Sequence, residues 1–465
     1  MKTHATSRPV TRRQFGKLAA LGLGGLLLPG CRREAPVAPP AVAVVPPAAP
    51  VQAGSNWAGN VAYHASRFEE PTTVGEVQEL VRSSQLIKPL GSRHSFSNIA
   101  DTQGTLVAMG RFNRIGNVDR ETRTVTVGSG VKYSDLCPNL LQQGYAVSNL
   151  ASLPHISVMA GATGTHGSGT GNLATQIVGL EFVNGLGDVV RLREGDDDFN
   201  GAVVGLGALG LVTSVTLRVV PEFQVRQWVW ENMPIDAYLE NFGSIIASGY
   251  SVSGFTTWRD ARVSEIWVKR RADAGDWNPG KDWFGATAAP RDRHPIVTMD
   301  HRPCTAQMGV PGPSWERLPH FRPDHPPSSR GRERQSEYFV RRRDGVAAIR
   351  AMYGIGPRIA TALQISEIRT VLRDNLWMSM AYGDDMVAFH FTWTENDVDV
   401  AAAIPIVEEA LRPFSPRAHH GKMTQITAEQ FAAGYPRFTD FQRLVRRQDP
   451  EGKFRNDWLT RFNLV

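Results

Sequence analysis

The feature that most restricts the fold is a glycine-rich hexapeptide, Gly205 to Gly210, whose spacing matches the dinucleotide fingerprint G-x-G-x-x-G. That fingerprint binds a dinucleotide where it joins a strand to a helix, because the pyrophosphate rests on the helix N-terminus. Here the glycines lead directly into residues 211–220, where apolar and polar residues alternate with the period of a half-buried strand. The sequence therefore argues against a Rossmann site and predicts a tight turn or a close approach of two backbone segments.

Short helices and strands are mixed irregularly between residues 57 and 222, which is typical of an α+β domain. One helix is predicted over residues 73–84, because Thr73 and Glu76 have the spacing of a capping box. A second helix is predicted to start with Ser134 as its cap and to stop at Gly144. The predicted strands of this region cover residues 105–109, 124–127, 177–183, 189–192 and 211–220.

The pattern changes after residue 222, and a length of 465 residues favours two domains. Strands are predicted at residues 258–269, 362–371 and 386–394, and a helix at residues 398–411. Residues 272–334 are rich in proline, arginine, tryptophan and glycine and show little periodicity. Long irregular segments inside compact chains often form functional surfaces. We therefore expect one domain over residues 57–222 and a second over residues 223–465.

Residues 1–56 have the pattern of an export signal followed by a tether. Arg12 and Arg13 precede eleven uncharged residues, 18–28, a run shorter than the roughly 20 residues of a membrane span. The paired arginines indicate a twin-arginine signal peptide over residues 1–30, and hence a twin-arginine export machinery as partner. Cys31 follows in a sequence that resembles a lipoprotein cleavage box, so a lipid anchor is expected there; cleavage elsewhere is the alternative.

Residues 31–56 are rich in alanine and proline and are predicted to form an extended linker. Such a linker would tether the folded part of the chain to the anchor. The expected location is therefore that of a membrane-anchored lipoprotein, or else the periplasmic or extracellular space.

Charge and cysteine content exclude other classes. The net charge is +6, but residues 1–30 contain five basic residues and no acidic one, so the rest of the chain carries only +1. A nucleic-acid binder needs a basic face that survives maturation, so we predict no nucleic-acid partner. Three cysteines cannot form a disulfide framework. His419 and His420 are adjacent and lack other ligands at metal spacing, so no metal site is predicted.

Two polar loops indicate an anion-binding site. Residues 161–171 contain five glycines, whose bare backbone amides can surround a diphosphate. This loop lacks the Lys-Ser/Thr ending of a P-loop, so ATP hydrolysis is not indicated; a flexible linker is the alternative. Residues 89–97 form a turn in which Arg93 and the backbone amides can hold phosphate. Taken alone, His94 in this turn is more typical of a structural residue than of a catalyst.

Taken together, these residues resemble the vanillyl-alcohol-oxidase type of flavoprotein and, within it, the alditol oxidases that act on xylitol or sorbitol. The similar stretches occur in family order through nearly all of residues 57–465. They are residues 91–96, 152–157, 162–169, 207–212, 366–369, 390–393, 420–422 and 449–456. The resemblance implies an α+β fold with a two-subdomain FAD-binding domain. It also implies a substrate or cap domain built on an antiparallel sheet, with a C-terminal segment that returns to the FAD domain.

The resemblance implies FAD as the cofactor, bonded covalently to His94 through the flavin 8α-methyl group. Such a bond would retain the flavin outside the cell and raise its potential. The residues that the resemblance assigns to the cofactor are Pro89, Leu90, Gly91, Ser92, Arg93, His94, Ser95, Ser152, Ser157, Gly161, Thr163, Gly164, Thr165, His166, Gly167, Val212 and Lys422.

The second domain would hold the substrate. A polyol carries a hydroxyl on every carbon, so its pocket must supply many directed hydrogen bonds. Ser152, Glu367, Arg369, Thr392 and Lys422 resemble the residues that bind the polyol. Glu367 and Arg369 lie two apart in a predicted strand and so share one face; a salt bridge without a substrate role is the alternative.

The expected reaction is oxidation of a primary alcohol to the aldose, with a hydride moved to flavin N5 and a proton removed from oxygen. Lys422 is the candidate cation that stabilises negative charge near flavin N1. His390 is the candidate proton acceptor, and a core histidine is the alternative reading of that residue. Glu367 and Arg369 complete the predicted catalytic set. O₂ is the expected oxidant, giving H₂O₂; a membrane electron acceptor would make the protein a dehydrogenase.

Other functions stay open at this point. Aldonolactone oxidases share the flavin domain and the C-terminal region, so a sugar lactone is the first alternative substrate. His420 stands where the family is expected to have tryptophan, which leaves the shape of the pocket open. A lipid-anchored carbohydrate-binding protein without turnover is the alternative from another class, and only the leader and the tether support it.

Overall fold

The structure is a computed structural model that describes residues 53–465 except 162–170, 281 and 326–331. The predicted signal peptide, Cys31 and nearly all of the linker lie outside the described residues. So do Thr163, Gly164, Thr165, His166 and Gly167. Helices and strands are mixed irregularly along the described chain, which confirms the predicted α+β class. No helix in this part of the chain is long and apolar enough to span a membrane.

The first layer is a small parallel sheet, with strand order β1-β3-β2. Its strands are β1 (Arg67–Glu69), β3 (Thr105–Ala108) and β2 (Ile87–Leu90). Helix α1 (Val74–Ser83) packs its buried Val77, Leu80 and Val81 against Ile87 and Val107 of this sheet. The capping box at Thr73 and Glu76 is present, which confirms the predicted start of the helix.

The second layer is an antiparallel sheet with strand order β4-β8-β6-β7. Its strands are β4 (Thr124–Gly128), β8 (Leu211–Arg218), β6 (Ile177–Val183) and β7 (Val189–Arg193). Strand β8 alternates buried and partly buried residues, as its sequence predicted. Helix α2 (Tyr133–Gln142) differs from the prediction: Lys132 is the N-cap, and Ser134 already lies inside the first turn.

The largest sheet is antiparallel and follows the order β13-β14-β10-β12-β11-β17-β18-β16-β19, with β15 paired to β10. Its strands are β10 (Gln224–Pro234), β11 (Ser251–Thr256), β12 (Arg262–Arg271), β13 (Asp282–Trp283), β14 (Ala286–Ala288), β15 (Gly312–Pro313), β16 (Arg334–Arg341), β17 (Leu363–Val371), β18 (Met386–Trp393) and β19 (Arg417–Ala418). This confirms the predicted antiparallel sheet in the second half. The strand expected at residues 258–269 begins later, because Trp258 has φ = +60° in the preceding turn.

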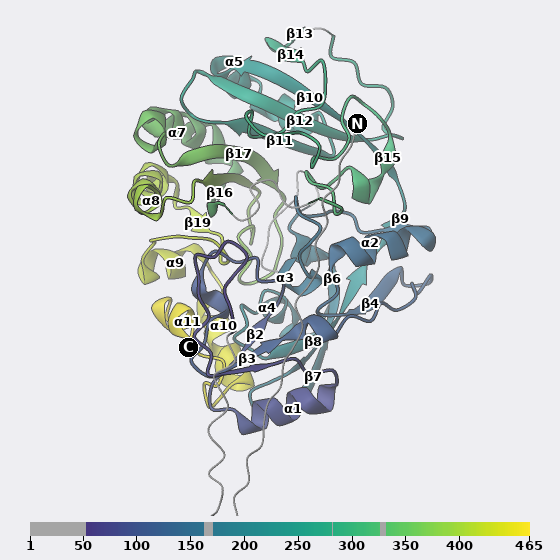
Figure 1. The fold of residues 1–465 in the computed structure, drawn as a ribbon, viewed down its shortest axis with the longest axis vertical. Coiled ribbons are helices and arrows are strands. Elements are labelled where there is room, and N and C mark those ends of the chain that lie inside the picture. Colours follow the sequence, from purple (N-terminus) through teal and green to yellow (C-terminus); the bar gives the residue numbers. More distant parts are fainter. Residues whose placement is uncertain (1–52, 162–170, 281, 326–331) are drawn as a thin grey trace, which may run out of the picture. The chain divides into compact units, whose positions relative to one another are not determined.

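Two long helices, α7 (Gly345–Ile359) and α8 (Asp397–Leu411), lie side by side on one face of this sheet (Figure 1). The buried Tyr338 and Phe389 of the sheet belong to the same apolar core as Ile349 of α7 and Val407 of α8. Because side chains of a strand alternate between faces, the neighbouring residues of β16 and β18 point to the opposite face. That face carries charged and polar side chains and is where the site lies.

The remaining elements are connections and short helices. They are α3 (Val158–Gly161), α4 (Phe199–Ala202), α5 (Ile235–Glu240), α6 (Phe242–Ala247), α9 (Ala428–Gly434), α10 (Phe438–Gln448), α11 (Asp457–Arg461), the strand pair β5 (Tyr145–Ala146) and β9 (Val220–Pro221), and the 3-10 helices η1 (Asn98–Ala100), η2 (Met109–Arg111), η3 (Leu173–Gln176), η4 (Ser314–Glu316), η5 (Arg342–Asp344) and η6 (Arg412–Phe414). The described residues between β12 and β16 form only short strands and the 3-10 helix η4 and are otherwise irregular, as predicted.

The C-terminal segment contacts the first layer. Lys453 accepts a hydrogen bond from the backbone N–H of Ile87 at 2.9 Å. Phe454 is fully buried in the cluster formed by α1 and the small parallel sheet. The Asn456 side chain donates to the carbonyls of Ile99 and Asp101 at 3.0 and 2.9 Å. The last residues of the chain thus help to hold the strand that precedes His94 and the loop that follows it.

Candidate active site

One cavity gathers most of the residues predicted from the sequence. Those that line it are Pro89, Leu90, Gly91, Ser92, Arg93, His94, Ser95, Ser152, Ser157, Val212, Glu367, Arg369, His390, Thr392 and Lys422. Gly161 ends helix α3, and its assignment to the cofactor stays a prediction. The cavity therefore joins the loop after β2 to the polar face of the large sheet.

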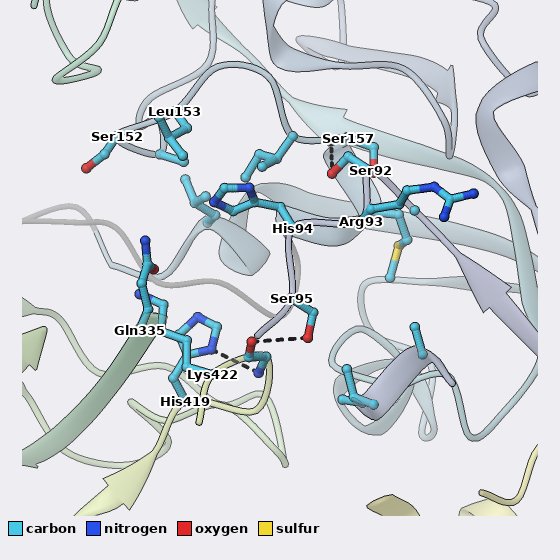
Figure 2. Close-up of a pocket in the computed structure, with 18 of the residues that line it drawn as sticks. Ser92, Arg93, His94, Ser95, Ser152, Leu153, Ser157, Gln335, His419 and Lys422 are labelled. Atoms are coloured by element: carbon cyan, nitrogen blue, oxygen red, sulfur yellow. Dashed lines mark hydrogen bonds between the residues drawn. The ribbon is translucent and has the colours of Figure 1, made fainter. Parts of the chain in front are cut away.

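His94 lies in the middle of this cavity, on the loop that follows β2. Figure 2 shows its ring directed towards Ser152 and Leu153, with Gln335, His419 and Lys422 below the ring in this view. The ring packs 4.7 Å from the ring of Trp57 and 5.7 Å from that of Phe96, between centroids. Burial, together with the charge of Lys422, lowers the pKa of His94 to about 4. The imidazole is therefore neutral at pH 7.

Hydrogen bonds fix this loop to the segments on both sides. The Ser92 hydroxyl accepts from the backbone N–H of Ser157 at 3.3 Å (Figure 2). The Ser95 hydroxyl donates to the carbonyl of Gly421 at 3.1 Å, next to Lys422. The positions of His94 and Lys422 are thus coupled through the backbone.

Arg93 does not point into the cavity with its charged end. Its guanidinium donates to the carbonyls of Ala53 and Ser55 at 2.6 and 3.2 Å, and it lies over the rings of Tyr63 and Phe68. Figure 2 shows the side chain running away from His94. The expectation that this guanidinium holds a phosphate is therefore not supported; it holds the N-terminal segment of the described chain.

The glycine turn singled out from the sequence also lines the cavity. A Cβ at Gly210 would lie 2.3 Å from the carbonyl oxygen of Val183, so the two backbone segments approach as closely as only glycine permits. Gly207, at φ = +64°, lies beside Lys88, whose buried ammonium donates to the Gly207 carbonyl at 2.9 Å. This confirms the prediction of a tight turn with a close backbone approach.

The cavity suits a dinucleotide such as FAD. It runs from this turn and the hydroxyls of Ser92 and Ser157 to the polar face of the large sheet. Ser129 also lines it, and the Ser129 hydroxyl is buried without a hydrogen-bond partner in the described structure. Apolar side chains such as Leu209 and Val212 complete the wall. A flavin ring needs apolar walls, whereas ribose and diphosphate need N–H and O–H donors, and both kinds of surface are present.

A buried chain of charges forms the other wall. Arg369 donates to Glu367 Oε2 at 2.9 Å and to Glu337 Oε1 at 2.5 Å. Lys422 Nζ donates to Glu337 Oε2 at 2.6 Å. Burial by itself raises the pKa of Glu337, but Arg369 and Lys422 hold it well below the usual range. Burial lowers the pKa of Lys422, and the charge of Glu337 opposes that effect. Glu337 and Glu367 thus compensate the positive charges of Arg369 and Lys422 in a part of the protein that is buried from water.

His390 occupies the same row of the sheet, opposite Glu367 on β17 and Glu337 on β16. Its Nε2 lies 3.1 Å from the Gln335 side-chain oxygen, which acts as the acceptor. Burial lowers the pKa of His390 to about 3, with Lys422 adding to the effect, so the ring is neutral at pH 7. Thr392, two residues on, faces the same cavity.

Sequence reasoning missed several residues of this wall. Gln335 and Glu337 lie on β16, which begins at the end of the segment predicted to be irregular and has no alternating pattern in its sequence. His320 lies within that irregular segment, and its Nε2 is 3.0 Å from Glu367 Oε1. His419 lines the cavity, whereas His420 points away and lies near the rings of Phe431, Tyr435 and Trp458. The histidine at position 420 therefore does not shape the pocket directly. The described residues contain no cluster suited to a metal ion.

Comparisons with known proteins agree with this architecture. Residues 65–193 match the family model of the FAD binding domain, and residues 332–462 match that of D-arabinono-1,4-lactone oxidase. The chain is 42% identical over 411 residues to an alditol oxidase of a Streptomyces species, covering 87% of this chain and 97% of the relative. The chain belongs to the alditol oxidase family. It is thus an FAD-dependent oxidoreductase.

Other relatives of this chain, at lower identity over most of its length, have names that refer to the oxidation of sugar lactones. The L-gulono-1,4-lactone dehydrogenase of Mycobacterium tuberculosis is 26% identical over 458 residues, covering 88% of this chain and 98% of the relative. The fold is similar to that of cholesterol oxidase from B. sterolicum, with a TM-score of 0.69 at 15% identity. That match covers 88% of this chain and 96% of the solved one. At that identity the likeness concerns the fold alone.

Proposed function

We propose that the protein oxidises the primary alcohol of an alditol to the aldose, with FAD as hydride acceptor and O₂ as the final oxidant, giving H₂O₂. The observation that carries the proposal is the polar face of the large sheet where it lines the cavity. Glu367, Arg369, Thr392 and Lys422 place carboxylate, guanidinium, hydroxyl and ammonium groups on one surface there. A substrate with a hydroxyl on every carbon can pair with each of these groups, whereas an apolar alcohol would leave them unpaired.

Each residue has a separate part in the proposed mechanism. When bound, FAD supplies the two-electron acceptor for the hydride of the alcohol carbon. Glu367 accepts a hydrogen bond from a substrate hydroxyl, and Arg369 and Thr392 orient neighbouring hydroxyls. His390 is neutral and accepts the alcohol proton, directly or through water. Lys422 provides a fixed cation in the cavity wall, which stabilises the negative charge that develops during oxidation.

We further propose a covalent bond between the imidazole of His94 and the flavin 8α-methyl carbon. It would replace one C–H bond of the methyl group, with protons lost from the methyl group and the imidazole and two electrons passed through the flavin to O₂. The support is that His94 lines the cavity and has a pKa lowered to about 4, so a neutral ring nitrogen is available for bond formation. The wild-type protein, unfolded in denaturant and passed over a size-exclusion filter, should retain its yellow colour. His94→Ala should release it into the filtrate. A wild type that loses its flavin, or a variant that keeps it, contradicts the bond.

The substrate is best tested by H₂O₂ formation across a panel of xylitol, sorbitol, L-gulono-1,4-lactone and D-arabinono-1,4-lactone. We expect the highest kcat/KM for an alditol. Dominant turnover of a lactone would favour the alternative function, which the match of residues 332–462 supports. Reduction of the flavin by alditols without H₂O₂ formation would assign the protein as a dehydrogenase with another acceptor.

We also propose export by the twin-arginine route with a lipid anchor at Cys31. The support is the Arg12-Arg13 pair, the short apolar run and the position of Cys31 after it. In a host with this export route, Arg12→Lys/Arg13→Lys should hold the protein in the cytoplasm. Cys31→Ala should release it from the membrane fraction. Unchanged membrane recovery of the second variant would contradict the anchor.

A further inference from the structure

Behind Glu367 lies a buried lysine that the proposed mechanism does not use. Lys269, on β12, is 1% exposed, and its ammonium group has three acceptors around it. They are the carbonyl of Leu318 at 2.5 Å, the carbonyl of Pro319 at 3.2 Å and Nδ1 of His320 at 2.9 Å. An ammonium group has three N–H donors, so these three acceptors account for all of them.

This contact fixes which nitrogen of His320 carries the proton. Because Lys269 donates to Nδ1, that nitrogen presents its lone pair, and a neutral ring then carries its hydrogen on Nε2. Burial, together with the charge of Lys269, lowers the pKa of His320 to about 4, so the ring is neutral at pH 7. Nε2–H thus donates to Glu367 Oε1 at 3.0 Å.

Glu367 is consequently held at both oxygens. Oε1 accepts from His320 and Oε2 accepts from Arg369 at 2.9 Å. The carboxylate therefore has a single orientation in the wall of the cavity. We propose that Lys269 and His320 form a positioning pair that orients the Glu367 carboxylate to bind a substrate hydroxyl. This inference rests on the proposed function, because a substrate hydroxyl on Glu367 is part of the proposed oxidation of an alditol.

The pair is more than an anchor for the irregular segment. Hydrogen bonds that do not involve Lys269 also hold the backbone around His320. The N–H groups of His320 and Phe321 donate to the Ser152 carbonyl at 3.1 Å each. The N–H of Thr305 donates to the His320 carbonyl at 2.9 Å. The Pro319 carbonyl also accepts from the Thr305 hydroxyl at 2.8 Å. Loss of the Lys269 ammonium should leave the segment in place while it frees the tautomer of the ring.

Lys269→Met keeps the length of the side chain and removes the three donors. Without them, His320 can carry its proton on Nδ1, and a lone pair on Nε2 then faces the carboxylate of Glu367. We expect the apparent Kd for xylitol, measured from anaerobic reduction at pH 6, to rise about tenfold or more, the value of one hydrogen bond to a charged group. The limiting reduction rate should stay within about threefold. Burial lowers the pKa of Lys269 to about 7, so at pH 6 the ammonium form prevails.

Matched variants separate positioning from folding. Arg270→Met removes a cation from the adjacent position, on the other face of β12, and should leave the Kd unchanged. His320→Gln offers an amide donor to Glu367 and an amide oxygen to Lys269, so it should restore most of the affinity that His320→Leu loses. In a Glu367→Gln background, Lys269→Met should add less than about threefold, because the group it orients is gone. An equal effect of Lys269→Met in both backgrounds would overturn the proposal.

The tautomer itself is a second readout, independent of turnover. In protein labelled with ¹⁵N-histidine, long-range proton–nitrogen spectra should show His320 protonated only at Nε2 in the wild type and at both nitrogens, in exchange, in Lys269→Met. A wild-type ring protonated at Nδ1 would refute the pair even if every alditol is oxidised. If neither alditol nor lactone reduces the flavin, the proposed function fails, and the spectrum still decides the pair. If Lys269→Met does not fold, the comparison of His320→Gln with His320→Leu decides it.

Discussion

Replacing Glu337 by glutamine should destabilise the protein far more than the same change at Glu231. Both carboxylates belong to one row of residues across the large sheet, and each is paired with an arginine. Glu337 is 1% exposed and also holds Lys422, whereas the Glu231 and Arg293 side chains are 21% and 20% exposed. Removing one partner of a buried pair costs about 3–5 kcal/mol, because an uncompensated charge remains. A pair that water partly reaches contributes less, and a fully exposed pair contributes about 1 kcal/mol or less.

These energies translate into different melting temperatures. With an unfolding entropy of about 2.1 cal/mol/K per residue, a loss of about 3 kcal/mol in a chain of this size lowers Tm by roughly 3–4 °C. Glu231→Gln should lower Tm by about 1 °C or less. Tryptophan fluorescence of the flavin-loaded proteins during heating at pH 7 measures both. Equal Tm values for the two variants would refute the claim that Glu337 compensates buried cations.

Two further substitutions test other parts of the structure. Burial raises the pKa of the Glu265 carboxyl from 4.5 to about 7. Between these two pH values the carboxyl is protonated in the folded protein but ionised in the unfolded chain. The free energy of unfolding therefore falls as the pH rises from about 4.5 to 7. Glu265→Gln abolishes this loss, so its stability relative to wild type should improve by roughly 2–3 kcal/mol from pH 5 to pH 8 in thermal unfolding; a constant difference would contradict the shifted pKa. Gly210→Ala should cost about 1–3 kcal/mol and weaken FAD retention, because its Cβ would lie 2.3 Å from the Val183 carbonyl oxygen. Gly243→Ala, where nothing lies within 4 Å in helix α6, should be neutral or stabilising, and equal effects of the two alanines would contradict the close approach.

Local patterns predicted the elements of the fold well. The capping box at Thr73 located helix α1, and the strict alternation after Gly210 located β8, because both signals are contained in a few neighbouring residues. Ser134 misled because a serine in the first turn resembles a cap in sequence, whereas the backbone places that position at Lys132. Trp258 has a β-prone side chain, but its positive φ puts it in a turn.

The candidate site was predicted less completely. The spacing of Glu367 and Arg369 showed that they share a face, and the structure brings them together as an ion pair. The partners that complete the wall come from distant positions: Glu337 from β16 and His320 from the irregular segment. Their proximity depends on strand order and on how residues 289–321 cover the sheet, and no local pattern in one sequence contains that information. The roles of residues 163–167 stay predictions, since they lie outside the described residues.

The central claim is that the cavity presents a hydroxyl-rich substrate to bound FAD beside Lys422. Anaerobic mixing of the loaded protein with xylitol, followed by the loss of flavin absorbance, tests it most directly. The account predicts complete bleaching by xylitol in the wild type. Lys422→Met should bleach about a hundredfold more slowly, as when one group that stabilises transition-state charge is removed. Absorbance that stays unchanged with xylitol, or equal rates in the two proteins, would contradict it.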